Sequence, residues 1–242
     1  MRVTKKTCFA LLVAAAFSFF LASSAFATTV SLDLTSPGST VTGTNALDGV
    51  YVGAYTATIN GVSTPVVCDD YTDESYVPED WTAYVNTFST LSDGQTKWGD
   101  NPTLYEEAFW LVEQMYNPAN SSEVGELSFA IWGLFDSTAL SDLQSYSTAD
   151  YNIAENWLTQ AEMSSNYGSV DTADFTIYTP DTSDSITCPG YSNGDCPDTP
   201  PQEFITYNAP EPSVAAILGA DLLLFGFVLE VLRRRGILKL VR

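Results

Sequence analysis

The cysteines and their acidic neighbours are the residues of this chain with the most distinctive chemistry. Cys68 is followed directly by Asp69 and Asp70, while Cys188 and Cys196 bracket the turn-rich stretch PGYSNGD. This short spacing suits a local disulfide, and a metal site there would lack histidine or further cysteine ligands. We therefore expect a Cys188–Cys196 disulfide, which leaves Cys68 as either a buried apolar residue or a reactive thiol.

The absence of histidine excludes several kinds of active site. The 242 residues include none, so a Ser-His-Asp triad, a Cys-His dyad and most zinc sites cannot be built. No glycine-rich phosphate loop stands between a strand pattern and a helix pattern. Carboxylates are plentiful, but Glu106, Glu107 and Glu113 are interpreted as a solvated helix face. We expect a non-enzymatic protein without a cofactor, and a carboxylate enzyme acting on glycans is the weakest alternative.

Two acidic clusters have the oxygen ligands that calcium prefers. The first, around the expected disulfide, is formed by Asp181, Asp184, Asp195 and Asp198. The second is formed by Asp69, Asp70, Asp73 and Glu74. The first cluster matches no EF-hand spacing, and for both a solvated loop is favoured over a calcium site. No other metal site is expected.

Charge is distributed very unevenly along the chain. Eight of the nine basic residues lie within positions 1–6 and 233–242, whereas residues 28–208 hold 27 acidic residues and a single base, Lys97. Such a surface repels nucleic acid phosphates and anionic lipid headgroups, so nucleic acid is not an expected partner. We interpret the acidity as keeping an exported protein soluble.

The start of the chain has the pattern of an export signal. Basic residues within positions 2–6 precede an apolar run over 9–21 and the small-x-small sequence at 25–27. This order is typical of a secretory signal peptide that is cleaved after Ala27. Cys8 would leave with it, and the three remaining cysteines would enter an oxidising compartment.

The end of the chain has the pattern of a membrane anchor. Pro-Glu-Pro within residues 209–213 precedes an apolar stretch over 213–232, which is followed by three arginines and a short extension to Arg242. Twenty helical residues span about 30 Å, which is enough for the bilayer core. The basic residues of 233–242 would hold this end in the cytoplasm. We expect a single-pass inner-membrane precursor with its N-terminus outside.

This tripartite tail resembles the PEP-CTERM sorting domain of bacterial exported proteins. The resemblance implies recognition by exosortase, a membrane processing enzyme, and a final location at the cell surface or outside the cell. It also implies an exopolysaccharide-producing bacterium, with exopolysaccharide as a further partner. The residues that match the recognised elements are Pro210, Glu211, Pro212, Arg233, Arg234 and Arg235. Asp221 departs from the family, because an ionised side chain near mid-membrane costs about 2.5–3.5 kcal/mol.

Between the two ends, strand patterns flank helical patterns. Alternating Val30, Leu32 and Leu34 predict a strand, and the apolar runs 50–59 and 62–71, joined by Asn60-Gly61, predict a hairpin with a type I′ turn. Strand patterns return in "DFTIYTP" and "EFITYN" near the end of this region.

Three segments between these strand patterns are expected to be helical. The first begins at Asn101 and Pro102, the second covers about 126–135 and is apolar nearly all round, and the third runs from Ser147 to about Met163. Strands, helices and strands predict an α+β domain over 28–208, in which a sheet or hairpin packs against about three helices. One transmembrane helix follows in the sorting tail, 209–242.

The middle of the chain has a weaker resemblance to the thioester domains of bacterial surface adhesins. Those domains place a cysteine on a strand and a glutamine shortly before an Ala-Ile-Trp segment. Cys68 and Ala130-Ile131-Trp132 match this pattern, but the residue expected to be glutamine is Ser128, which has no amide to lose as ammonia. The resemblance implies kinship of fold and an adhesin-like binding module without a Cys-Gln thioester. Gln114 lies at a different position and is a poor substitute.

Overall fold

A computed structural model describes residues 28–40, 50–93, 95–189 and 199–208. The expected signal peptide, the sorting motif, the predicted transmembrane helix over 213–232 and the arginine cluster lie outside these ranges, so those predictions stay predictions. In the part of the chain that is described, no helix is long and apolar enough to cross a membrane.

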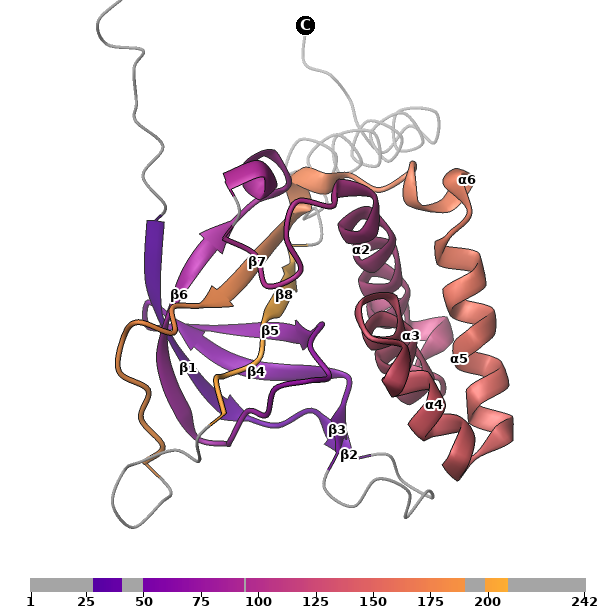
Figure 1. Cartoon of the computed structure of the whole chain (residues 1–242), viewed down its shortest axis with the longest axis horizontal. Coiled ribbons are helices and arrows are strands. Elements are labelled where there is room, and N and C mark those ends of the chain that lie inside the picture. Colours follow the sequence, from indigo (N-terminus) through magenta and orange to yellow (C-terminus); the bar gives the residue numbers. More distant parts are fainter. Residues whose placement is uncertain (1–27, 41–49, 94, 190–198, 209–242) are drawn as a thin grey trace, which may run out of the picture.

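Six antiparallel strands form a closed barrel in the spatial order β1-β4-β5-β8-β7-β6 (Figure 1). These strands are β1 (Thr28–Ser36), β4 (Ala54–Ile59), β5 (Val62–Cys68), β6 (Glu79–Asn86), β7 (Phe175–Pro180) and β8 (Phe204–Tyr207). Two further short strands, β2 (Ser39–Thr40) and β3 (Tyr51–Val52), pair with each other. The last strands along the chain therefore return to pair with strands from the N-terminal half.

The hairpin of β4 and β5 follows directly from its two-residue turn. Asn60 and Gly61 both have positive φ, 49° and 82°, as a type I′ turn requires. The resulting register places Tyr55 opposite Val66 and Ile59 opposite Val62. The predicted hairpin is thus confirmed, and Cys68 is the last residue of its second strand.

Strand β6, which the sequence analysis did not predict, closes the barrel. It pairs with β1 along Thr28 to Leu34 on one side and with β7 on the other. Its residues Trp81 and Ala83 are buried, while Thr82 between them is only partly covered. Since both neighbours are distant in sequence, the closure depends on pairings that no local pattern reveals.

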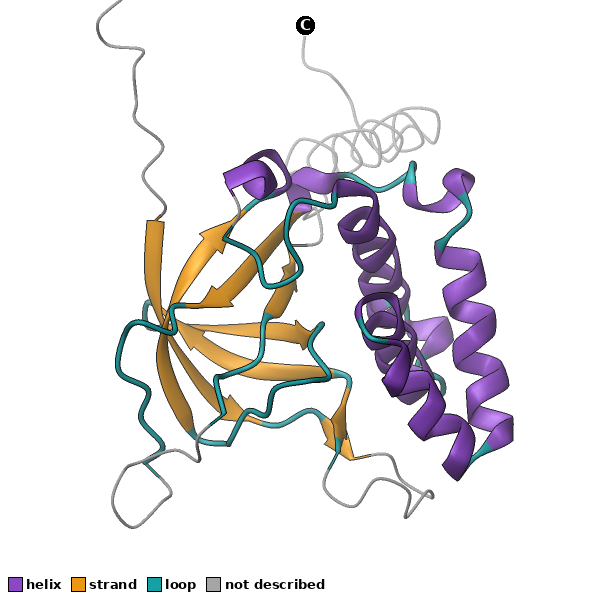
Figure 2. Cartoon of the chain, viewed as in Figure 1, coloured by secondary structure: helices purple, strands orange, loops and turns teal. Residues whose placement is uncertain are grey.

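The helices gather on one side of the barrel (Figure 2). They are α2 (Pro102–Tyr116), α3 (Val124–Phe135), α4 (Ser137–Tyr146), α5 (Thr148–Ala161) and the single turn α6 (Ser164–Tyr167), with short 3₁₀ turns η1 (Phe88–Asp93), η2 (Pro118–Asn120) and η3 (Thr172–Asp174). The predicted caps are confirmed, because the Asn101 side chain accepts from Leu104 N and Ser147 from Asp150 N. The count of about three helices is wrong. Helix α4 was missed because "STALSDLQSY" is rich in serine and carries few apolar residues.

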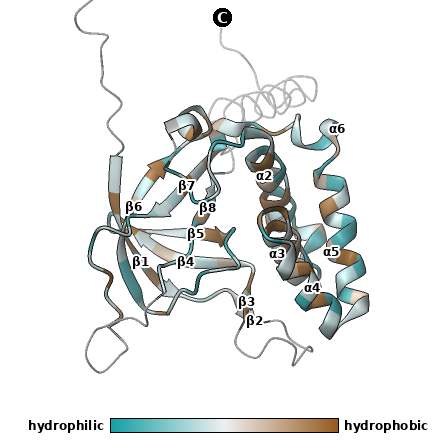
Figure 3. Ribbon diagram, viewed as in Figure 1, coloured by the Kyte–Doolittle hydropathy of each residue, from teal (hydrophilic) through white to brown (hydrophobic). Residues whose placement is uncertain are grey.

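Helix α3 is the central element of the helical layer, as its composition predicts. Its residues Leu127 to Trp132 are all buried, and it packs against α2, α4 and α5. Figure 3 shows the apolar segments that α2 and α3 contribute beside the barrel. The described region is therefore an α+β structure in which an antiparallel barrel supports a layer of helices.

Candidate functional site

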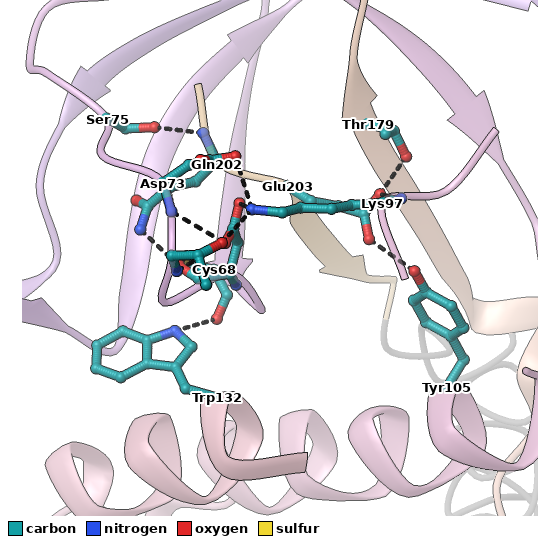
Figure 4. A network of polar contacts seen from close by, with 11 residues as sticks. Cys68, Asp73, Ser75, Lys97, Tyr105, Trp132, Thr179, Gln202 and Glu203 are labelled. Carbon is teal, nitrogen blue, oxygen red and sulfur yellow. Dashed lines mark hydrogen bonds and ion pairs between the residues drawn. The ribbon is translucent and has the colours of Figure 1, made fainter. Parts of the chain in front are cut away.

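The end of β5, the segment before α2 and the start of β8 meet in a cluster of charged side chains (Figure 4). We call this cluster the acidic network; its members are Asp69, Asp70, Asp73, Lys97 and Glu203. Three of them, Asp69, Asp70 and Glu203, have no solvent exposure. Four carboxyl groups and one amino group thus lie in a largely buried environment, where unpaired charge is costly.

Lys97 supplies the positive charge of the acidic network. Its Nζ donates to Asp70 Oδ2, to Asp73 Oδ2 at 2.6 Å and to Thr72 Oγ1 at 2.6 Å. Nζ also lies 5.0 Å from the ring centroid of Trp98. Burial lowers the pKa of Lys97, but the hydrogen bonds to Asp70 and Asp73 outweigh this effect and raise it. The resting state is therefore an ammonium held by two carboxylates.

Asp70 is fixed from both ends of its carboxylate. While Oδ2 faces Lys97, Oδ1 accepts from Thr72 N at 3.0 Å, from Thr72 Oγ1 at 2.9 Å and from Asp73 N at 3.2 Å. The backbone of residues 70–73 is thereby wrapped around one oxygen atom. This arrangement stabilises negative charge on Oδ1.

Glu203 connects the acidic network to the helical layer and to β7. Its Oε1 accepts from the Tyr105 hydroxyl at 2.7 Å, and its Oε2 accepts from Lys97 N at 2.9 Å and from Thr179 Oγ1. Asn86 in turn donates to Thr179 Oγ1 at 3.1 Å. Because these donors come from α2, β7 and the segment before α2, Glu203 ties three separate parts of the fold together.

Asp69 and Glu203 are two fully buried acids whose backbones are joined by a hydrogen bond from Asp69 N to Glu203 O at 3.3 Å. Neither oxygen of Asp69 accepts a hydrogen bond from an N–H or O–H group of the described residues, yet its carboxyl lies within hydrogen-bonding reach of Glu203. Burial, followed by the nearby charges of Glu203 and Asp70, raises the pKa of Asp69 well above its ordinary value. These effects favour the protonated form of Asp69.

Cys68 is a buried thiol at the edge of the acidic network. Its Sγ donates to Asp70 O at 3.1 Å and accepts from Asp70 N at 3.3 Å, while Trp132 Nε1 donates to Cys68 O at 3.0 Å. Burial and the neighbouring carboxylates raise the pKa of the Cys68 thiol. Both effects disfavour the thiolate, which is the nucleophilic form.

The residue at the expected glutamine position serves another purpose. Ser128 Oγ donates to Val124 O at 3.0 Å and accepts from Gly53 N at 2.8 Å, so it joins α3 to the bend between β3 and β4. Cys68 contacts α3 through Trp132 instead. The structure thus brings together Cys68 and the Ala-Ile-Trp segment that carry the resemblance, while Ser128 has different partners.

The two acidic clusters that the sequence suggested as calcium candidates differ in their surroundings. Asp184 accepts from Thr82 Oγ1 at 2.5 Å and Asp181 from Ser183, and these hydrogen bonds lower the pKa of both carboxyls. Asp195 and Asp198 lie outside the described residues. Within those residues no group of three or more potential ligands is placed to hold a metal ion.

The interpretation of the second cluster as a solvated loop is wrong for its two leading members. Asp69 and Asp70 are fully buried beside Glu203 and Lys97, which are distant in sequence, and Lys97 supplies a counter-charge to Asp70. Cys188 is buried, and its expected partner Cys196 lies outside the described residues. The disulfide therefore stays a prediction.

Lys97, Tyr105, Thr179 and Glu203 were missing from the residues singled out for chemistry. One signal did point to Lys97: it is the single base among 27 acids in residues 28–208, so some carboxylates had to compete for it. Glu203 carries no comparable local signal, since "QEFITYN" reads as an ordinary strand with an acidic start.

A comparison of the chain with protein-family models, with curated proteins and with solved structures finds no match. The candidate site is consequently defined by its own geometry. Asp69 and Glu203 have no exposed surface, so a substrate from solvent does not reach them, whereas the side chains of Lys97 and Asp73 are each 22% exposed.

Proposed function

We propose that this chain is a non-enzymatic exported protein of the cell surface or extracellular matrix, sorted through a PEP-CTERM tail by exosortase. The observation that carries the proposal is the order of Pro210-Glu211-Pro212, the apolar stretch 213–232 and Arg233 to Arg235 behind an N-terminal export signal. The bacterium that makes it would produce exopolysaccharide, which is a further candidate partner. Recognition would occur just outside the inner membrane.

The described domain supports this proposal through its charge and its interior. Its single base is bound by Asp70 and Asp73, so residues 28–208 offer no basic side chain that is not already paired with a carboxylate. Strong net charge keeps a protein soluble and resists non-specific association. A domain released into a hydrated polymer matrix would benefit from both properties.

The test is the mature C-terminus of the native protein. In a strain with an active exosortase, mass spectrometry is expected to find a chain that ends near residue 212, and a variant with Pro210, Glu211 and Pro212 changed to alanine is expected to retain its tail. Substitution of Lys239 and Arg242 by glutamine removes basic charge beyond the arginine cluster and serves as the matched control. A wild-type chain that remains intact through Arg242 would contradict processing.

The second candidate is an adhesin-like binding module that stays anchored by the C-terminal helix. The contact between Cys68 and Trp132 favours it, because the same two positions carry the resemblance to thioester domains. We expect no Cys-Gln thioester, since Ser128 is bound to Gly53 and Val124 and has no amide. Incorporation of methylamine with a mass deficit of about 17 Da in the untreated chain would overturn this expectation.

A further inference from the structure

We propose that Lys97 and Asp70 form an intramolecular isopeptide bond, which joins the end of β5 to the segment before α2. The bond would link Lys97 Nζ to Asp70 Cγ and would be made by the chain itself. Figure 4 shows Lys97 and Asp73 among the side chains that meet at the acidic network, and Lys97 Nζ contacts Asp70 there although the two residues are far apart in sequence. The inference concerns a covalent modification and is independent of sorting by the tail.

The two reacting groups are already held together. Lys97 Nζ contacts Asp70 Oδ2, and the backbone of Lys97 is fixed independently by the hydrogen bond from its N–H to Glu203 Oε2. Asp70 is fixed by the donors around Oδ1 and has no exposed surface. Because folding already holds the nucleophile against its electrophile, the reaction does not have to overcome the loss of translational and rotational entropy that an encounter in solution would require.

The surroundings of Asp70 Oδ1 fit an acyl transfer. When Nζ attacks Cγ, negative charge develops on one carboxyl oxygen of the tetrahedral intermediate. Oδ1 faces Thr72 N, Thr72 Oγ1 and Asp73 N at 2.9–3.2 Å, which is the arrangement of an oxyanion hole. Oδ2, which faces the amine, is then the oxygen that leaves.

Asp73 is placed to carry the protons. It accepts from the same Nζ at 2.6 Å, and burial raises the pKa of its carboxyl. Asp73 can therefore take a proton from the ammonium and pass it to Oδ2, which leaves a neutral amine facing a neutral carboxylic acid. After the attack, a second proton passes from the nitrogen to Oδ2 by the same route, so that Oδ2 leaves as water. The partial exposure of Asp73 gives the released water a path out of the site.

The reaction balances without any further reagent. The ammonium of Lys97 holds three protons and the carboxylate of Asp70 holds none. The Nζ–Cγ bond forms, the Cγ–Oδ2 bond breaks, one proton stays on the amide nitrogen and two leave with Oδ2 as water. Nothing is oxidised or reduced, and the reaction happens once per molecule, so a slow rate suffices.

The sequence makes the experiment unusually clear. Lys97 is the only lysine or arginine between Ala27 and Arg233, so trypsin can cut the denatured domain at one internal position. An acylated lysine is not a tryptic site. The full chain, purified from the exporting cell, denatured and reduced, is expected to weigh about 18 Da less than its encoded mature mass and to resist cleavage after residue 97.

Four variants separate the bond from other sources of mass loss. Lys97→Arg keeps a positive charge and a tryptic site but removes the amine, and Asp70→Ala removes the electrophile; both are expected at full mass and are cut after residue 97. Asp70→Asn is expected to form the bond with loss of ammonia instead of water, which lowers the mass by about 17 Da. Asp73→Asn keeps the two reacting groups and is expected to lower the bonded fraction at equal times.

Wild-type protein of full encoded mass that is cut completely after Lys97 would overturn the proposal, and Lys97 would then be an ion-pair partner only. A loss of water together with complete cleavage would also overturn it, because that result indicates dehydration elsewhere, such as a succinimide. Fragmentation of the resistant peptide is expected to show a branched product that joins residues 70 and 97.

Discussion

At the scale of single residues, Glu203 shows how hydrogen bonds offset the desolvation of a buried carboxyl group in this fold. It accepts hydrogen bonds from Tyr105, Thr179 and the backbone of Lys97. Each donor offsets part of the cost of removing a carboxylate from water. The loss of any one donor leaves a lone pair buried without a partner.

The first prediction concerns the Tyr105 hydroxyl. Tyr105→Phe is expected to reduce the free energy of unfolding by about 1–3 kcal/mol, because Glu203 Oε1 loses its donor at 2.7 Å while the ring remains packed. Urea denaturation followed by tryptophan fluorescence measures the change. Tyr116→Phe is the matched control, since the buried Tyr116 hydroxyl has no hydrogen-bond partner among the described residues. Equal stability of both variants would contradict the assigned role of Glu203.

The second prediction concerns Glu79, a buried acid on β6. Burial raises its pKa to about 7, although Tyr76 N donates to Oε2 at 2.7 Å. A carboxyl whose pKa is higher in the folded state binds its proton more tightly there, so it stabilises the fold at acidic pH. That stability is lost as the pH rises from about 4.5 to about 7 and amounts to at most about 3 kcal/mol.

Glu79→Gln is therefore expected to reduce the fall in the free energy of unfolding between about pH 5 and about pH 8, the range that brackets the titration of Glu79. Denaturation curves across that range measure the slope. Glu155→Gln, which neutralises an exposed acid on α5, controls for the loss of one negative charge. An unchanged slope in Glu79→Gln would show that Glu79 does not titrate in this range.

Single residues also show which features of the site the sequence predicts and which it does not. "VVCDDY" correctly marks the end of a strand and the most polar point of the hairpin. It does not reveal that Asp69 and Asp70 are buried, because their partners Glu203 and Lys97 lie far along the chain. Burial of an acid is decided by non-local partners, and a local pattern records only its polarity.

At the scale of elements, the bend between β3 and β4 meets the first turn of α3. Gly53 has φ +82°, its N–H donates to Ser128, and a Cβ at this position would lie 2.7 Å from Val124 Cγ1. Positive φ and close contact both require glycine here. This contact couples the barrel to the central helix.

The third prediction separates these two requirements. Gly53→Ala is expected to destabilise the protein by roughly 2–4 kcal/mol, because it adds a steric clash to an unfavourable φ. Gly61→Ala has the same φ of +82° but meets nothing within 4 Å, so it is expected to cost only about 1 kcal/mol. Thermal denaturation of the two variants measures the difference. Equal shifts would mean that the Val124 contact adjusts without cost.

Elements defined by local chemistry were predictable, and elements defined by distant pairing were not. The Asn60-Gly61 turn and the caps at Asn101 and Ser147 act within a few residues, and all three are confirmed. Strand β6 was not predicted because it is defined by its pairings with β1 and β7, which are distant in sequence. Barrel closure is a property of these contacts, so the sequence indicated α+β without indicating a barrel.

At the scale of the whole molecule, charge is the dominant feature. Residues 28–208 carry 27 acids, and their one base is already bound to Asp70 and Asp73. Most acids of this region therefore have no basic side chain to pair with. Self-repulsion of this kind destabilises a compact state, and dissolved salt screens it.

The fourth prediction is that sodium chloride stabilises this protein. Raising the salt from about 0.01 M to about 0.1 M shortens the screening length from about 30 Å to about 10 Å, so repulsion between separated surface acids falls. The midpoint of thermal unfolding, followed by circular dichroism, is expected to rise by a few degrees. A lower midpoint at higher salt would mean that screening of the partly exposed Lys97 ion pairs outweighs the relief of repulsion.

Calcium chloride at equal ionic strength tests the remaining calcium candidates Asp181, Asp184, Asp195 and Asp198. A rise in the midpoint equal to that in sodium chloride indicates screening alone, whereas a larger and saturable rise indicates a calcium site.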